Sequence, residues 1–152
     1  MTPSPANKHM LAALAEAEAA GERGEVPVGA VIVGGDGRIL VRAGNRMREL
    51  CDPTAHAEML AIRAACAAVQ SERLTGADLY VTLEPCPMCA AAISFARIRR
   101  LYFGAGDPKG GGVENGPRIF SQPSCHHAPE VYGGIAEARS ARLLQAFFAH
   151  RR

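Results

Sequence analysis

Two short stretches, Asp52-Pro-Thr-Ala-His-Ala-Glu58 and Tyr80-Val-Thr-Leu-Glu-Pro-Cys-Pro-Met-Cys89, determine how the rest of the chain is interpreted. They contain a His-x-Glu motif at residues 56–58 and a Cys-x-x-Cys motif at residues 86–89. One imidazole and two thiolates form a ligand set with a strong preference for zinc. Three protein ligands leave the fourth tetrahedral position open, which is typical of catalytic rather than structural zinc. We therefore predict that His56, Cys86 and Cys89 bind zinc.

The first motif is predicted to open a helix that runs from about Ala55 to Val69. Residues 52–54 precede it with cap residues and a proline suited to a first helical turn. Within a helix, side chains two residues apart point roughly 200° apart, so His56 and Glu58 can converge only beyond a helix N-terminus. This placement brings Glu58 close enough to the open metal position to handle protons.

The second motif is expected to begin another helix near Pro87. Cys86 and Cys89 are three residues apart, so they share one face of its first turn. The positive partial charge of a helix N-terminus favours both cysteines as thiolates. We therefore expect two helix N-termini to meet at one metal. Both helices are apolar almost all round, which predicts that they lie in the core.

The remaining pattern is that of an α/β protein, with apolar runs separated by glycine-rich turns. The expected elements are a helix over 7–20, a hairpin of strands 26–33 and 38–43, strands at 79–83, 99–103 and 131–132, and a last helix over 135–152. Residues 44–53 form a loop that carries Asn45. Residues 104–116 form a glycine-rich loop without a P-loop pattern, and residues 117–129 are expected to be irregular.

Composition is that of a soluble globular chain. The 152 residues, 48% hydrophobic and 21% charged, suit a single domain over 1–152, with residues 1–6 expected to be flexible. No apolar run approaches the ~18 residues of a membrane helix, and no signal-peptide pattern is present, so we expect a cytoplasmic protein without a membrane partner. The net charge of +2 neither requires nor excludes a nucleic acid partner.

Five cysteines, two of them in the metal motif, do not suggest a disulfide framework. Cys66 lies in an apolar helical run and is expected in the core, whereas Cys51 and Cys125 have polar surroundings. The alternative to a catalytic metal is a structural zinc whose fourth ligand is Cys125, His126 or His127.

Taken together, these motifs resemble those of the bacterial tRNA-specific adenosine deaminases, within the zinc deaminase superfamily that includes cytidine and deoxycytidylate deaminases. The similarity extends to Glu25–Val31, to Gly44-Asn45-Arg46, to Gly104–Asp107 and to the last helix. It implies a three-layer α/β/α sandwich around a five-stranded mixed sheet, one Zn²⁺ per subunit and a homodimer. It also implies that Asn45 contacts the target base and that Gly104–Asp107 approaches the anticodon backbone. Gly106–Cys125 departs from the family pattern by its richness in glycine and proline.

The resemblance implies hydrolytic deamination of adenosine to inosine at wobble position 34 of tRNA, by zinc-activated water with Glu58 as the proton shuttle. The metal motif does not select the base, so the same reaction on free guanine, cytosine or cytidine is the alternative. A third hypothesis is a non-catalytic RNA-binding domain with structural zinc. The amide of Asn45 suits the reading of a base edge, although an ordinary loop role remains open. Arg97, Arg99 and Arg100 suit RNA contact, helix capping, a dimer interface or solvent equally well.

Overall fold

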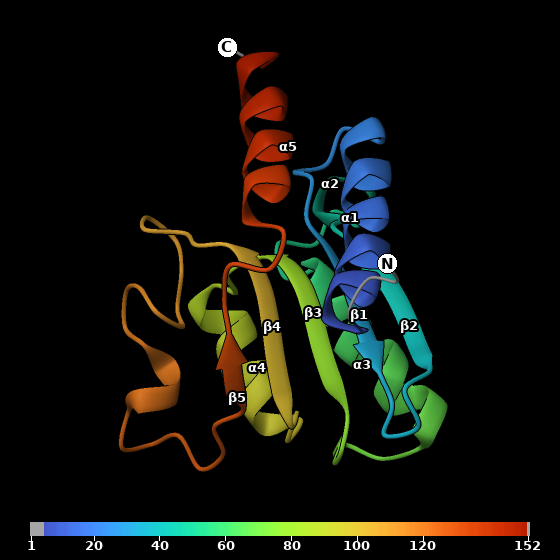
Figure 1. The fold of residues 1–152 in the computed structure, drawn as a ribbon, viewed down its shortest axis with the longest axis vertical. Helices are drawn as coiled ribbons and strands as arrows, with labels where there is room; N and C mark the ends of the chain where they lie inside the picture. The colour runs from blue at the N-terminus through green and yellow to red at the C-terminus, as the bar shows by residue number, and fades with distance from the viewer. Residues whose placement is uncertain (1–4, 152) are drawn as a thin grey trace.

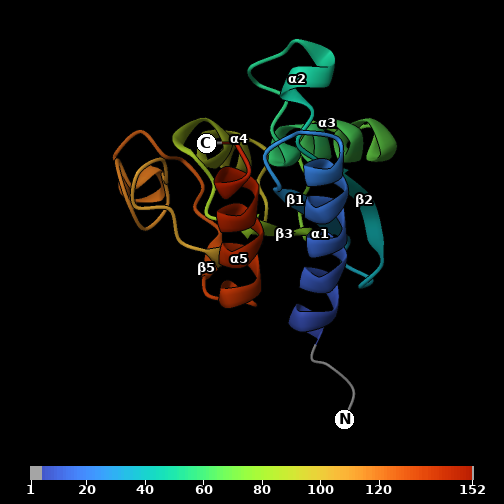
Figure 2. The same ribbon diagram turned by 90° about the horizontal axis from the view of Figure 1, so that it is seen from above.

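The computed structural model describes residues 5–151 and has three layers. The middle layer is a five-stranded mixed sheet in the order β2-β1-β3-β4-β5. Helices α1 (Pro5–Glu22) and α5 (Glu137–Ala149) cover one face, and α3 (Ala57–Val69) and α4 (Pro87–Phe95) cover the other (Figures 1 and 2). This confirms the predicted α/β/α sandwich. Of residues 1–6, expected to be flexible, residues 1–4 lie outside the described residues, and residues 5 and 6 belong to α1.

The strand directions explain where the site forms. β1 (Gly29–Val33) pairs antiparallel with β2 (Ile39–Gly44) and with β3 (Asp78–Leu83). β3, β4 (Arg100–Ala105) and β5 (Glu130–Tyr132) run parallel. A parallel pair needs a crossover, and α4 supplies it between β3 and β4. The C-terminal ends of β3 and β4 therefore lie at the same end of the sheet. In open α/β sheets, ligands bind beyond the C-terminal ends of the strands.

Two apolar clusters hold the layers together. The larger lies between the sheet and the pair α3 and α4, and includes Leu79, Val81, Ile93 and Phe103. The smaller lies under α1 and includes Met10, Leu14, Val31 and Tyr80. All five residues of β1 are buried because both faces of the sheet are covered there.

The first strand begins later than expected, at Gly29 instead of residue 26. Val28 N–H donates to Val26 O at 2.8 Å, which turns this segment away from the ladder, and Pro27 has no N–H to contribute. A Cβ at Gly29 would collide with Ala13 O, so this glycine allows α1 to cross the sheet closely. Val26 and Val28 are thereby free to line the candidate site.

The loop predicted at 44–53 contains a short helix, α2 (Met47–Leu50), which we did not expect. The Glu25 carboxylate accepts hydrogen bonds from Arg48 N–H (3.0 Å) and Glu49 N–H (2.9 Å). This side chain lies 23 residues before Arg48 in sequence, so local pattern does not indicate the contact.

The third helix also differs at its start. It begins at Ala57 with His56 as its N-cap residue, and no side chain caps it. Asp52 instead accepts hydrogen bonds from Thr54 N–H (2.8 Å) and Thr54 Oγ1 (2.7 Å), so the predicted cap residues form a turn of their own. That turn precedes the helix and directs His56 toward its N-terminal end.

α3 and α4 pack against the core as expected, but neither helix is buried on all sides. Only one side of α3 is buried, Val69 is 44% exposed, and Phe95 at the end of α4 is 77% exposed. The last helix covers residues 137–149, shorter than predicted, because Ala136 takes a left-handed conformation before it. A 3₁₀ turn over Ile119–Ser121 lies in the segment expected to be irregular. No helix within residues 5–151 is long and apolar enough to cross a membrane.

Candidate metal centre and active site

The three predicted metal ligands lie together although they come from two helices. His56 precedes α3, Cys86 is the N-cap residue of α4, and Cys89 lies in the first turn of α4. The Nδ1 atom of His56 is 3.7 Å from Cys86 Sγ and 3.6 Å from Cys89 Sγ. Two helix N-termini thus meet at one cluster, as the sequence predicted.

These separations fit a zinc ion. Bonds of about 2.3 Å to sulfur and about 2.0 Å to nitrogen at a tetrahedral angle place the two donor atoms roughly 3.6 Å apart. All three ligand atoms lie within 4.8 Å of one another. The donor set, one imidazole nitrogen and two sulfurs, is one that zinc favours.

The two thiols are electrostatically coupled. The hydrogen bond with Cys89, together with nearby His56, lowers the pKa of Cys86 to about 4. The Cys86 sulfur, followed by burial, raises the pKa of Cys89. Two thiolates so close together are disfavoured without a positive charge beside them, which a bound cation would supply.

The structural-zinc alternative receives no support from the position of Cys125. Its Sγ donates to His127 O at 3.1 Å and lies 3.5 Å from Ser94 Oγ. The His127 ring contacts Ile98 O at 2.7 Å. Within the part of the chain that the structure describes, the metal-ligand cluster contains only His56, Cys86 and Cys89. His56 and Cys86 of this cluster line the neighbouring cavity, together with Glu58.

Glu58 lies beside this cluster and is almost fully buried, with 4% of its surface exposed. Burial, as the largest effect, raises the pKa of Glu58 to about 7. A carboxyl with such a pKa can accept and donate protons at neutral pH. The predicted proton shuttle and predicted ligands thus share one site.

Asn45 reaches the same place from the end of β2. Its Nδ2 donates to Val26 O at 3.0 Å, and its Oδ1 accepts the Ala57 N–H at 2.8 Å. These two bonds use the amide oxygen and one of the two amide N–H groups, which leaves one N–H for a ligand. Asn45 is only 4% exposed and lines the cavity, so its amide lies where it could meet a ligand.

The cavity over the cluster has a volume of about 230 Å³. Drug-sized ligands occupy pockets of about 300–1,000 Å³, so this cavity suits a group the size of one base. Its lining includes the candidate catalytic residues and the ends of two loops: Val26, Val28, Asn45, Met47, His56, Glu58, Leu83, Cys86, Asp107 and Gly110.

Sequence reasoning missed the part played by Glu84, which it treated only as the end of a strand. This side chain is 2% exposed and accepts hydrogen bonds from the glycine-rich loop. Burial alone would raise the pKa of Glu84, but the hydrogen bonds from Asp107 N–H and Asn115 lower it overall. No local sequence signal indicated these contacts, because the donors lie 23 to 31 residues further along the chain.

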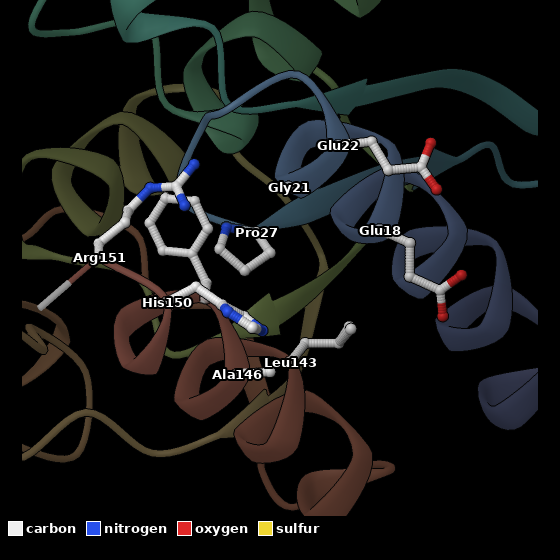
Figure 3. A pocket seen from close by; sticks show the side chains of 9 residues that line it. Glu18, Gly21, Glu22, Pro27, Leu143, Ala146, His150 and Arg151 are labelled. Carbon is white, nitrogen blue, oxygen red and sulfur yellow. The ribbon is translucent and has the colours of Figure 1, made fainter.

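A larger cavity of about 400 Å³ lies between α1 and α5 (Figure 3), and its lining does not include His56, Cys86 or Cys89. Glu18 and Glu22 lie on its α1 side, and His150 and Arg151 lie at the end of α5 (Figure 3). The Arg151 guanidinium stacks 3.8 Å from the Phe147 ring centre. Pro27 lines this cavity, while its sequence neighbours Val26 and Val28 line the smaller one.

The basic residues at 97–100 lie elsewhere. Arg99 pairs with Asp78 through two hydrogen bonds of 3.0 and 2.8 Å, and Arg100 lies 3.3 Å from Glu130. Arg97 follows α4 in a left-handed conformation. Because Arg99 and Arg100 stand at the beginning of β4, they are at the opposite end of the sheet from the cluster.

Comparisons with known proteins agree with this geometry. The family model for the cytidine and deoxycytidylate deaminase zinc-binding region matches residues 3–105. The tRNA-specific adenosine deaminase of Agrobacterium fabrum is 69% identical over 140 residues, which cover 92% of this chain and 91% of that protein. The tRNA-specific adenosine deaminase of Bacillus subtilis is 46% identical over 140 residues, covering 92% and 86%.

A solved structure shows the same fold. It comes from biochemical and structural studies of A-to-I editing by tRNA:A34 deaminases at the wobble position of transfer RNA. It is 69% identical in sequence, has a TM-score of 0.88, and the match covers 90% of this chain and 99% of that chain.

Proposed function

This chain belongs to the family of the cytidine and deoxycytidylate deaminase zinc-binding region, and from this premise we propose that it deaminates adenosine to inosine at position 34 of tRNA. It is a zinc-dependent hydrolase, and the reaction consumes water and releases ammonia. The observation that carries the proposal is the buried Glu58 carboxyl in a base-sized cavity shared with His56 and Cys86. The choice of tRNA as the substrate rests on the relatives that are named tRNA-specific adenosine deaminases or tRNA:A34 deaminases.

In this proposal His56 Nδ1, Cys86 Sγ and Cys89 Sγ hold one zinc ion per subunit. When bound, zinc supplies a Lewis acid that makes a water molecule nucleophilic at neutral pH. Glu58 accepts one proton from that water and passes it to ring nitrogen N1 as the water oxygen bonds to C6. It then takes the second proton of that oxygen and gives it to the amine, which leaves C6 as ammonia while the oxygen stays on C6 as the carbonyl of inosine. The pKa of Glu58, about 7, suits both directions of transfer.

Asn45 is proposed to orient the base. Its oxygen is held by Ala57 N–H, so the amide cannot rotate freely and presents its remaining N–H to the cavity. A donor at this place would bind a ring acceptor of the purine. Because Ala57 is the first residue of α3, the same bond fixes the base reader relative to His56 and Glu58.

The proposed macromolecular partner is the tRNA anticodon loop. A base in a single-stranded loop leaves its stack at low cost, which allows it to enter a recessed cavity. The cavity between α1 and α5 is the proposed place for nucleotides next to the target, with the exposed Arg151 guanidinium as its candidate phosphate contact. The compartment we propose is the cytoplasm, where tRNA is used and where cysteine ligands stay reduced.

We also propose a homodimer. Phe95 is 77% exposed on α4, and a small apolar cavity beside it is lined by Ala91, Ile119 and Cys125 among others. A second copy covering this face would remove an apolar surface from water. Sedimentation of the zinc-loaded chain gives its mass in solution; a monomer would reject this part of the proposal.

The test of the substrate is a parallel assay of the zinc-loaded chain on an A34 anticodon stem-loop and on free adenosine, cytidine, cytosine and guanine. Inosine in the stem-loop, with little turnover of the small molecules, is the expected result. If a free base is deaminated and the stem-loop is not, the deamination mechanism stands and the substrate is the free base. The base-sized cavity also admits such a substrate. No turnover of any of them would favour an RNA-binding domain.

A further inference from the structure

We propose that Glu84 is a positioning residue whose buried carboxylate holds residues 106–116 in place as one wall of the base cavity. The inference rests on the proposed deaminase function and concerns how the same site acquires its shape. Glu84 follows β3 directly and stands two residues before Cys86. One short segment would therefore fix both a metal ligand and the loop that encloses the substrate.

The hydrogen bonds of Glu84 join the beginning of the loop to its end. Oε1 accepts from Asp107 N–H at 2.9 Å and from Asn115 Nδ2 at 2.7 Å. Oε2 accepts three backbone N–H groups, from Val113 (3.1 Å), Glu114 (2.9 Å) and Asn115 (3.0 Å). Since a carboxylate has only acceptors, it can satisfy all these donors at once, as no neutral side chain of the same shape can.

Two glycines allow this close approach. A Cβ on Gly111 would lie 2.5 Å from Glu84 Oε2 and 2.6 Å from Asp107 O. A Cβ on Gly112 would lie 2.6 Å from Pro87 N, at the start of α4. The glycine-rich composition of the loop thus has a steric reason, because its backbone packs directly against Glu84 and against the segment that carries Cys86.

The same loop reaches the cavity. Asp107 and Gly110 line it together with Val26 and Asn45. The Asp107 carboxylate is engaged within the loop, where Oδ1 accepts Gly110 N–H at 2.9 Å and Lys109 N–H at 3.2 Å. Gly112 N–H donates to Pro85 O at 2.8 Å, which ties the loop to the metal motif. Release of Glu84 would therefore move the wall while Glu58, which belongs to α3, stays in place.

The direct test is Glu84→Gln in the full zinc-loaded chain. The substitution keeps the shape but turns one acceptor oxygen into an NH₂ group that faces N–H donors. A buried polar group without a partner is costly enough to release the loop, so we expect KM for the A34 stem-loop to rise on the order of tenfold. We expect kcat and the zinc-to-protein ratio to stay near those of the wild type. Hydrogen exchange of amides 107 and 113–115 should accelerate, while exchange in α3 is unchanged.

Three further variants control the result. Asp36→Asn alters a carboxylate that accepts Arg38 N–H in the β1–β2 turn, far from the cavity, and should change none of these quantities. Asn115→Ala removes one of the hydrogen bonds to Glu84 and should raise KM in the same direction by a smaller factor. Gly111→Ala displaces the carboxylate from the other side and should reproduce Glu84→Gln. The last two keep the proposal testable if Glu84→Gln does not fold.

The outcomes separate positioning from a general structural role. A smaller folded fraction lowers kcat and leaves KM unchanged, so that pattern with unchanged exchange in the loop would overturn the proposal. Loss of zinc from Glu84→Gln, Asn115→Ala and Gly111→Ala, with zinc retained in Asp36→Asn, would overturn it too, because Glu84 would then act through the metal. If the wild type forms no inosine in the stem-loop, the proposed function has failed. In that case, the rate of amide hydrogen exchange at residues 107 and 113–115 still shows whether Glu84 holds the loop in place.

Discussion

The oxygen of the Asn45 side chain accepts the Ala57 N–H at 2.8 Å, which joins the loop after β2 to the first turn of the helix that carries Glu58. A residue expected only to touch a base thus also fixes the relative position of the base reader and the proton shuttle. This double use explains why Asn45 is buried although it lies in a loop.

Asn45→Asp tests the two uses separately. The carboxylate can still accept the Ala57 N–H, but it has no N–H for Val26 O or for the base. We expect KM for the stem-loop to rise on the order of tenfold, because a carboxylate now faces the ring acceptor. Steady-state kinetics measures this change, with thermal unfolding to confirm the fold. An unchanged KM would assign Asn45 a role in the loop alone.

Zinc content should depend on His56, Cys86 and Cys89 and on no residue of the 125–127 segment. Cys89→Ser is expected to lose most of the bound zinc, because a hydroxyl is a much poorer ligand than a thiolate. A variant with Cys125→Ser, His126→Ala and His127→Ala should retain wild-type zinc per folded molecule. Metal analysis after gel filtration measures both. Loss of zinc in the triple variant would favour the structural site instead.

The free energy of unfolding at acid pH should show how much the ionised Glu25 carboxylate stabilises the fold. Burial alone would raise the pKa of Glu25, but the hydrogen bonds from Arg48 and Glu49 N–H lower it overall. A carboxyl with a lowered pKa in the folded state stabilises the fold above its unfolded pKa of about 4.5, and this contribution disappears as the pH falls through the folded pKa. The free energy of unfolding should therefore differ most between wild type and Glu25→Gln near neutral pH.

Urea unfolding of both proteins at about pH 7 and at about pH 4 measures that difference. We expect the gap to narrow at the lower pH. A gap of equal size at both values would mean that the variant loses packing rather than the charged carboxylate.

Binding of RNA should involve Arg151, which lies exposed at the rim of the larger cavity. Arg151→Ala is expected to weaken binding of the stem-loop and to reduce the slope of log K against log salt by about 0.7–0.9, the value for one phosphate contact. Arg38→Ala, at the turn after β1, is the matched control and should leave the slope unchanged. An equal slope for Arg151→Ala and wild type would exclude a phosphate contact.

The ligand cluster was predictable because its determinants are local. The spacing of Cys86 and Cys89 places both in one helical turn, and His56 and Glu58 can serve one metal only at a helix start. The apolar runs indicated an α/β protein, the family resemblance implied three layers around a five-stranded sheet, and the observed sheet confirms this.

The parts that sequence reasoning missed depend on contacts between distant segments. Glu84 and Asn115 are 31 residues apart, so no window of sequence indicates that a strand-end carboxylate will organise the glycine-rich loop. The late start of β1 reflects the turn at Val26–Val28, and the start of α3 reflects the preference of Asp52 for its own turn. In each case a hydrogen bond outside the local pattern decides the boundary.

The most direct test of the central claim is turnover by Glu58→Gln at matched zinc content. The variant keeps the shape of the side chain and removes its ability to accept a proton. With the A34 stem-loop as substrate, we expect zinc per subunit to equal that of the wild type and inosine formation to fall by about 10²–10⁴-fold. Equal zinc with a near-normal rate would contradict the assignment of Glu58 as the group that moves protons in this site.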